Sequence, residues 1–329
     1  MSEIYLANMG SKGVAKQVAI KRVKPQLSRD EQLLEMFRHE ARIGSMLNHP
    51  NIVHVYDVDE EDLVPYIVME YIQGYELNVF LRRGISLGKP LPMDHAVELV
   101  RQAAMGMAHF HAKRTAAGAP LEIVHCDISP TNLLVTRNGF VKILDFGIAR
   151  SRDHLYRNPP VVAGKPSYMS PEQVNKEEVD LRSDIFSLGI ILYEMTVGRR
   201  LFRGPSAEVL KQFTDDDIPE PTSILAGYPA QLEPIVMRAL ASKPGSRFQS
   251  ARDFADALEG FLHSRAPLCT ATRIAEYVRQ IYPHADSEVL EPTALVAAEA
   301  ANAPSITAAR IAIIGLVMIL LVSGLLWLA

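Results

Sequence analysis

The sequence predicts an α+β fold in which strand patterns gather near the start of the chain and helical patterns dominate the remainder. In residues 1–24, two apolar runs flank a Gly-containing turn region, which is typical of a β-hairpin. Apolar residues recur at helical spacing over 29–48, and further helices are predicted over 91–111 and 250–262. The chain has 329 residues, 48% hydrophobic and 22% charged, an ordinary globular composition that can hold a sizeable core.

Composition excludes several classes of function. The net charge is -4, and no basic stripe with interleaved aromatic residues occurs, so nucleic acid is not an expected partner. The two cysteines, Cys126 and Cys269, belong to no Cys-x-x-Cys or Cys/His cluster, and a reducing, cytosolic setting is the simplest account of them. The first residues show no basic stretch followed by an apolar core, so we expect no secretory signal.

The stretch around which the chain is organised is residues 123–135, IVHCDISPTNLLV, followed closely by residues 141–147, VKILDFG. The neighbouring apolar ends of these stretches are predicted to be short strands joined by an Asn-Gly turn. Such a hairpin brings Asn132 and Asp145 together. An isolated Asp-Phe-Gly is usually just a turn, so the interpretation depends on the spacing of both stretches.

These two stretches resemble the catalytic core of eukaryotic-like protein kinases, including the bacterial, myxobacterial-type serine/threonine kinases. The resemblance implies a two-lobed protein kinase fold over residues 1–263, with a small, mainly β N-lobe and a larger, mainly α C-lobe. It also implies that Asp127 lies at the substrate hydroxyl and that Asn132 and Asp145 hold Mg²⁺. The implied phosphate donor is ATP, and the implied acceptor is Ser or Thr of a protein substrate.

The same resemblance assigns roles before the central stretch. The strand that ends the first hairpin carries the motif VAIK, which implies that Lys21 contacts the α and β phosphates of ATP. Glu40, on the predicted helix over 29–48, takes the place of the glutamate that pairs with this lysine. Without the rest of the pattern, a solvated lysine and a surface glutamate would be the simpler interpretations. Ser28 or Asp30 caps the start of this helix.

Residues 65–71 form an apolar strand that runs into a polar segment with Gly74, which resembles the hinge between the kinase lobes. The resemblance implies that the apolar side chain of Met69 lines the back of the adenine pocket. It also implies that the backbone of Glu70, Tyr71 and Ile72 bonds the edge of the adenine.

Kinases usually carry a Gly-x-Gly-x-x-Gly loop between their first two strands, which covers the phosphates. This chain begins beyond the leading glycines, so the N-lobe is expected to lack its first strand. Either the true start lies upstream, or the protein lacks part of its nucleotide lid. We favour an N-terminally incomplete chain, because a strand without its neighbour leaves an edge that proteins normally cover.

After the central stretch, residues 148–168 resemble an activation segment. Glu172 closes it as the counterpart of the glutamate in the family's Ala-Pro-Glu motif, and a structural ion pair with Arg247 is implied. Asp184 resembles the aspartate that binds the backbone of the catalytic loop. The alternative for Asp184 is a plain helix cap, and both interpretations place it at the start of a helix.

Two departures from the family pattern stand out. Cys126 replaces an arginine that usually binds a phosphorylated activation segment, so activation by that route is not expected. Ser129 replaces a lysine of the catalytic set, while Lys165, after Gly164, replaces a threonine that approaches it. Either hydroxyl and ammonium have been exchanged across one contact, which leaves a cation near the transferred phosphate, or the two losses are unrelated. Myxobacterial kinases show similar Asp-x-Ser-Pro and Gly-Lys patterns.

The chain changes character after the predicted kinase domain. Residues 264–309 contain a short amphipathic helix over 270–282 and an Ala/Pro-rich linker. Residues 311–329, which follow Arg310, are apolar and uncharged, and at about 1.5 Å per residue they reach roughly 28 Å, close to the ~30 Å of a bilayer core. The predicted domain 310–329 is therefore a C-terminal transmembrane anchor, in preference to a buried core helix.

The sequence thus predicts a tail-anchored, single-pass serine/threonine kinase at the cell membrane, with its catalytic domain in the cytoplasm and homodimerisation as a possible further property. The alternative is a tail-anchored pseudokinase that acts as a binding scaffold. The missing glycine loop favours the scaffold. The expected catalytic set favours the enzyme, and its main members are Lys21, Glu40, Asp127, Asn132 and Asp145.

Overall fold

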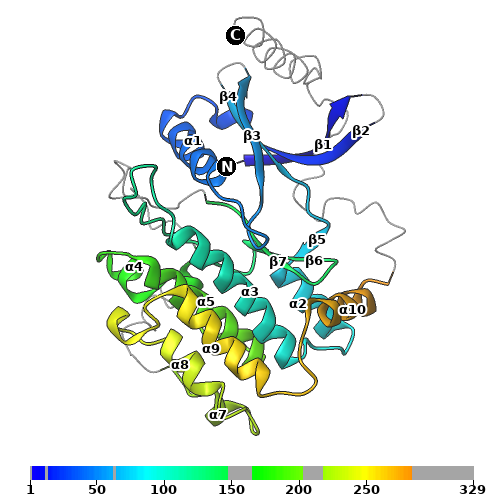
Figure 1. The fold of residues 1–329 in the computed structure, drawn as a ribbon, viewed down its shortest axis with the longest axis vertical. Coiled ribbons are helices and arrows are strands. Elements are labelled where there is room, and N and C mark those ends of the chain that lie inside the picture. The colour runs from blue at the N-terminus through cyan, green and yellow to red at the C-terminus, as the bar shows by residue number, and fades with distance from the viewer. Residues whose placement is uncertain (1, 12–13, 62–63, 147–164, 203–217, 284–329) are drawn as a thin grey trace, which may run out of the picture. The chain divides into compact units, whose positions relative to one another are not determined.

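The structure is a computed structural model that describes residues 2–11, 14–61, 64–146, 165–202 and 218–283. The described chain forms two compact units (Figure 1). The first contains the residues up to Glu35 together with Val55–Tyr71, and the second contains Met36–His54 and the described residues from Ile72 onward. The strands of the first unit and the helices of the second agree with the predicted α+β class.

The first unit is built on a four-stranded antiparallel sheet in the order β1-β2-β4-β3. Its strands are β1 (Ser2–Ser11), β2 (Val14–Val23), β3 (Val55–Glu61) and β4 (Val64–Glu70). The predicted first hairpin is confirmed, with Ser2 opposite Val23 and Lys21 opposite Ile4. On β2, Val18 and Ile20 pack with Tyr66 and Val68 in one cluster, and the alternate residues Ala19 and Lys21 are buried as well, so both faces of the strand are covered there. Among the described strands, β1 lies at an edge of the sheet.

Helix α1 (Glu31–Ser45) begins at the Asp30 cap. Oδ1 of Asp30 accepts hydrogen bonds from the backbone N–H groups of Gln32 and Leu33, each at 3.1 Å. The hydroxyl of Ser28 donates to Pro25 O instead, so of the two expected caps it is Asp30 that satisfies the first N–H groups of the helix.

The second unit is mainly helical. Its principal elements are β5 (Gly74–Glu76), α2 (Leu77–Ser86), α3 (Met93–His111), β6 (Leu133–Thr136), β7 (Val141–Ile143), α4 (Pro171–Asn175), α5 (Leu181–Val197), α7 (Pro221–Ile224), α8 (Glu233–Ala239), α9 (Ala251–His263) and α10 (Ala271–Ile281). Helix α5 is mainly apolar and almost completely buried, and α3 packs against both α5 and α9 (Figure 1). These buried helices form the core against which the loops of the unit are fixed.

A small antiparallel sheet, β5-β6-β7, connects the helices to the central stretch. Tyr75 lies opposite Val135, and Leu133 lies opposite Ile143. The turn between β6 and β7 contains Gly139 at φ +81°, a conformation that side chains disfavour, and the predicted Asn-Gly hairpin is confirmed. The hairpin therefore places the residue before β6 and the residues after β7 at the same end of the sheet.

The predicted amphipathic helix is formed as α10, and Thr270 caps its start by accepting from the backbone N–H of Arg273. Its buried face consists of Ile274, Ala275, Tyr277, Val278 and Ile281. Among the described residues, none of the helices is both long enough and apolar enough to cross a bilayer. The predicted membrane anchor and nearly all of the predicted linker fall in residues 284–329, outside the described residues.

Candidate active site

The catalytic loop, residues 123–132, is fixed at its start by the buried carboxylate of Asp184 on α5. Asp184 Oδ2 accepts a hydrogen bond from His125 N at 2.8 Å, and Asp184 Oδ1 accepts one from Cys126 N at 2.9 Å. His111 Nε2 lies 2.9 Å from the same Oδ2. Several polar contacts thus compensate a carboxylate that has no access to water. The expected binding of the loop backbone by Asp184 is confirmed, and the helix cap is Asp180 instead.

Cys126 adopts a left-handed backbone conformation, with φ +66°. This conformation costs free energy in a residue with a Cβ, and the surrounding bonds must hold it. The backbone N–H of Cys126 donates to Asp184, and its backbone carbonyl accepts from Gln173 Nε2 at 2.9 Å. The thiol is buried, with Sγ 3.6 Å from Val124 O. The predicted consequence for activation concerns residues 147–164, outside the described residues, and stays a prediction.

Asn132 orients Asp127. The Nδ2 group of Asn132 donates to the backbone carbonyl of Asp127 and to its Oδ2, each at 2.8 Å. Because the amide nitrogen is committed to Asp127, the carbonyl oxygen Oδ1 is the atom of Asn132 with the character of a metal ligand. Asp127, expected at the substrate hydroxyl, and Asn132, expected to hold Mg²⁺, are therefore joined by hydrogen bonds into one unit.

Asp145 is brought to the same place by the β6–β7 hairpin. Leu144 N donates to Asn132 O at 2.9 Å, and His125 Nε2 lies 2.9 Å from Leu144 O. Asp145 itself has a φ of +57°, and the ring of the next residue, Phe146, is buried 4.9 Å from the His125 ring. One carboxylate and one amide oxygen fit Mg²⁺, which keeps several waters and substrate phosphates among its ligands.

Lys165 lies beside the other end of the catalytic loop. Its ammonium contacts the hydroxyl of Thr131, and this hydroxyl lies 3.2 Å from the Oγ of Ser129. The Ser129 side chain is fully buried, whereas Lys165 is exposed. The structure thus brings the two departures from the family pattern together through Thr131. Sequence reasoning missed Thr131, although its hydroxyl lies between Ser129 and Asn132 in the sequence and could have drawn attention to it. Gly164 lies outside the described residues.

The remaining candidate residues are divided between the two units. In the first unit, Lys21 is buried on β2, and the three predicted nucleotide contacts on or after β4 are half-buried: Met69, Glu70 and Tyr71. In the second unit, Glu40 is buried on α1, and Ile72 is half-buried ahead of β5.

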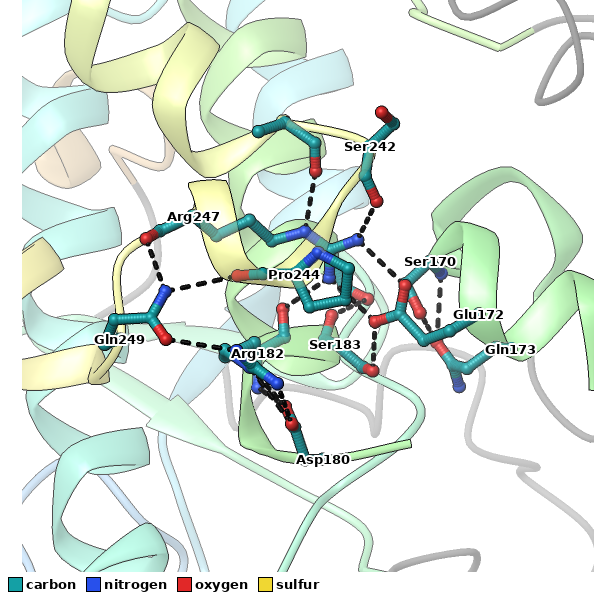
Figure 2. A network of polar contacts seen from close by, with 12 residues as sticks. Ser170, Glu172, Gln173, Asp180, Arg182, Ser183, Ser242, Pro244, Arg247 and Gln249 are labelled. Atoms are coloured by element: carbon teal, nitrogen blue, oxygen red, sulfur yellow. Dashed lines mark hydrogen bonds and ion pairs between the residues drawn. The ribbon is translucent and has the colours of Figure 1, made fainter. Parts of the chain in front are cut away.

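A buried ion pair connects α4 with the loop before α9 (Figure 2). Arg247 donates from Nη1 to Glu172 Oε1 at 2.7 Å and from Nη2 to Oε2 at 2.8 Å. Its other N–H groups reach the carbonyls of Ala241, Arg182 and Ser242, so all its donors are used. Burial raises the pKa of Glu172, but the bonds and charge of Arg247, with the Ser183 hydroxyl, outweigh it and hold that pKa below its ordinary value. The predicted structural pair is confirmed.

Comparisons with known proteins agree with this geometry. The chain matches the protein kinase domain over residues 3–262. It is 40% identical over 265 residues to tyrosine-protein kinase MasK of Myxococcus xanthus, which covers 80% of this chain and 41% of that protein. It is 36% identical over 264 residues to serine/threonine-protein kinase PknB of Mycolicibacterium smegmatis, covering 77% and 40% respectively.

Among solved structures, the PknI kinase domain of Mycobacterium tuberculosis aligns with a TM-score of 0.58 and 26% identity, over 79% of this chain and 91% of that one. The chain therefore spans well under half of the length of the two curated relatives, and nearly all of a solved domain.

Proposed function

The chain belongs to the protein kinase family, and on that premise we propose that it transfers the γ-phosphate of Mg-ATP to Ser or Thr of a protein substrate. The observation that carries this proposal is the unit formed by Asp127 and Asn132 next to Asp145. Relatives named serine/threonine-protein kinases support the class of acceptor. The retained catalytic residues favour the enzyme over a pseudokinase scaffold.

Each residue has a distinct task in this proposal. Asp127, held by the Asn132 amide, accepts the hydrogen of the attacking hydroxyl and orients its oxygen toward the phosphate. Asn132 Oδ1 and the Asp145 carboxylate would hold Mg²⁺, which when bound would neutralise the negative charge of the phosphates. The Lys165 ammonium, beside Thr131, supplies a positive charge next to the catalytic loop.

The proposal is tested by transfer of labelled phosphate from ATP to the chain itself and to a generic protein acceptor. Asp145→Ala removes the carboxylate that would hold the metal, so transfer should fall to background while the circular dichroism spectrum is unchanged. Asp256→Ala is the matched control, because Asp256 is a half-exposed carboxylate on α9, and it should transfer at the wild-type rate. Undiminished transfer by Asp145→Ala would refute the assignment.

Tyrosine is a second candidate acceptor, because the myxobacterial relative at 40% identity is named a tyrosine-protein kinase. The departures at Ser129 and Lys165 occur beside the loop that must receive the acceptor hydroxyl. Acid hydrolysis of the labelled product and separation of phosphoserine, phosphothreonine and phosphotyrosine decides between the two. Label in phosphotyrosine alone would replace Ser/Thr as the acceptor class.

We further propose that residues 310–329 anchor the protein in the cell membrane with the kinase domain in the cytoplasm. The apolar, uncharged composition of residues 311–329 supports this. Deleting the segment should move the protein from the membrane pellet to the soluble fraction. Continued pelleting after an alkaline wash would count against this segment as the anchor.

A further inference from the structure

Helix α10 lies against the sheet that carries the candidate active site (Figure 1). At its end, the ring of Tyr282 stacks on the ring of Tyr75, with centroids 3.6 Å apart and 6° between the planes. Tyr75 is buried in β5, which starts just after Ile72, the last of the predicted adenine contacts. Arg83 on α2 supports this end of the helix by donating from Nε to Ile281 O at 3.3 Å.

The middle of α10 fits closely into α2. The hydroxyl of Tyr277 donates to Lys89 O at 2.7 Å, and its ring meets the ring of Phe80 edge to face at 5.6 Å. The fit requires a glycine in α2, because a Cβ on Gly84 would lie 2.3 Å from the Tyr277 hydroxyl oxygen. A helix interior normally disfavours glycine by about 1 kcal/mol relative to alanine. Gly84 therefore indicates that α2 is shaped to receive α10.

The start of α10 lies against the turn of the β6–β7 hairpin. A Cβ on Gly139 would come within 2.0 Å of Ala271 O, so the turn and the helix backbone are in direct contact. In the same turn region, Arg137 N donates to Gln73 O at 3.0 Å and ties the hairpin to the segment before β5. The helix thus contacts the small sheet at two places: beside the segment that follows Ile72, and at the hairpin that carries Asn132 and Asp145.

We propose that α10 is a positioning element of the nucleotide site. Tyr282 and Tyr277 are positioning residues that fix β5 and α2, and through them the adenine-contacting segment that continues into β5. This inference rests on the proposed function, since it assigns nucleotide contacts to residues 70–72. Loosening α10 should weaken nucleotide binding without altering the chemical step.

The test compares Tyr282→Ala with Tyr282→Phe in the full chain. Calorimetry measures the Kd for Mg²⁺ and a non-hydrolysable ATP analogue, and kinetics separate KM for ATP from kcat. Tyr282→Ala should raise Kd and KM by about five-fold and leave kcat within about two-fold, since an aromatic pair contributes modestly beyond burial. Tyr282→Phe should match wild type, because the ring makes the contact and the hydroxyl has no hydrogen-bond partner among the described residues.

Two further variants complete the experiment. Tyr277→Phe removes one hydrogen bond while keeping the fold, and should raise Kd by about two-fold. Glu276→Ala, on the exposed face of α10, should bind as wild type does. A wild-type Kd in both Tyr282→Ala and Tyr277→Phe, or a fall in kcat at constant KM, would overturn this inference and leave the proposed function standing. A wild-type chain that binds no nucleotide would overturn the proposed function, and this inference with it.

Discussion

The two ends of the catalytic loop are held by different kinds of group. The start is held by the Asp184 carboxylate, which is fully buried and has several partners. The other end, at Ser129 and Thr131, meets the ammonium of Lys165, which is exposed. Buried polar groups are costly to leave unpaired, whereas exposed charges contribute little to stability. The comparison teaches that breaking the contacts of Asp184 should cost far more stability than breaking the contact of Lys165.

The largest expected effect concerns the buried Glu172–Arg247 ion pair, which bonds Arg182 and Ser183 at the start of α5, next to Asp184. Arg247→Met leaves the Glu172 carboxylate buried without its partner, and should lower the free energy of unfolding by about 3–5 kcal/mol in urea titrations. Replacing Glu172 by Met in the same chain should recover part of the loss. Arg252→Ala, in an exposed pair with Asp256, is the control and should cost under about 1 kcal/mol. Equal losses in Arg247→Met and the control would remove the distinction between buried and exposed groups.

Asp184→Ala should come next. It leaves the N–H groups of His125 and Cys126 without their acceptor and should cost about 2–3 kcal/mol, with a large fall in kcat because the loop loses its fixed position. Asp180→Ala removes only a helix cap and should cost about 1 kcal/mol with kcat retained. If both variants kept full kcat, Asp184 would be a structural residue with no influence on the loop.

A smaller effect is expected in how the free energy of unfolding depends on pH in the acid range. The pKa of Glu172 in the folded chain lies below its ordinary 4.5, so its stabilisation is fully present above pH 4.5 and is lost as pH falls through the folded pKa. Wild type and Glu172→Gln should therefore differ most above pH 4.5 and converge below it in unfolding experiments. A constant difference across this range would contradict the coupling.

The contact beside the exposed Lys165 should show the smallest interaction energy. Lys165→Thr removes the ammonium beside Thr131 and should lower turnover, and Ser129→Lys in the same chain should restore much of it. The double-mutant cycle should give a coupling energy of about 1 kcal/mol, as expected for side chains in contact. Purely additive effects would make the two departures independent losses.

Sequence reasoning found the elements whose signals are local or carried by a motif. The Asn-Gly turn, the Glu172–Arg247 pair and the helix at α10 are all formed. It could not choose between the two helix caps or between the two roles of Asp184, because hydrogen bonds decide both choices. Thr131 was missed because its role depends on a residue 34 positions away in the chain. The docking of α10 depends on Tyr75 and Gly84, which no periodicity connects with Tyr282 and Tyr277.

The central claim is that Asp127, held by Asn132, receives the acceptor hydroxyl in phosphoryl transfer. Single-turnover transfer from γ-labelled ATP by Asp127→Asn tests it most directly, because the amide keeps the shape of the side chain but cannot accept the hydroxyl proton. The rate should fall by about 10²–10⁴-fold, the range for a general base, while the Kd for Mg-ATP stays at the wild-type value. Transfer by Asp127→Asn at the wild-type rate would contradict the account.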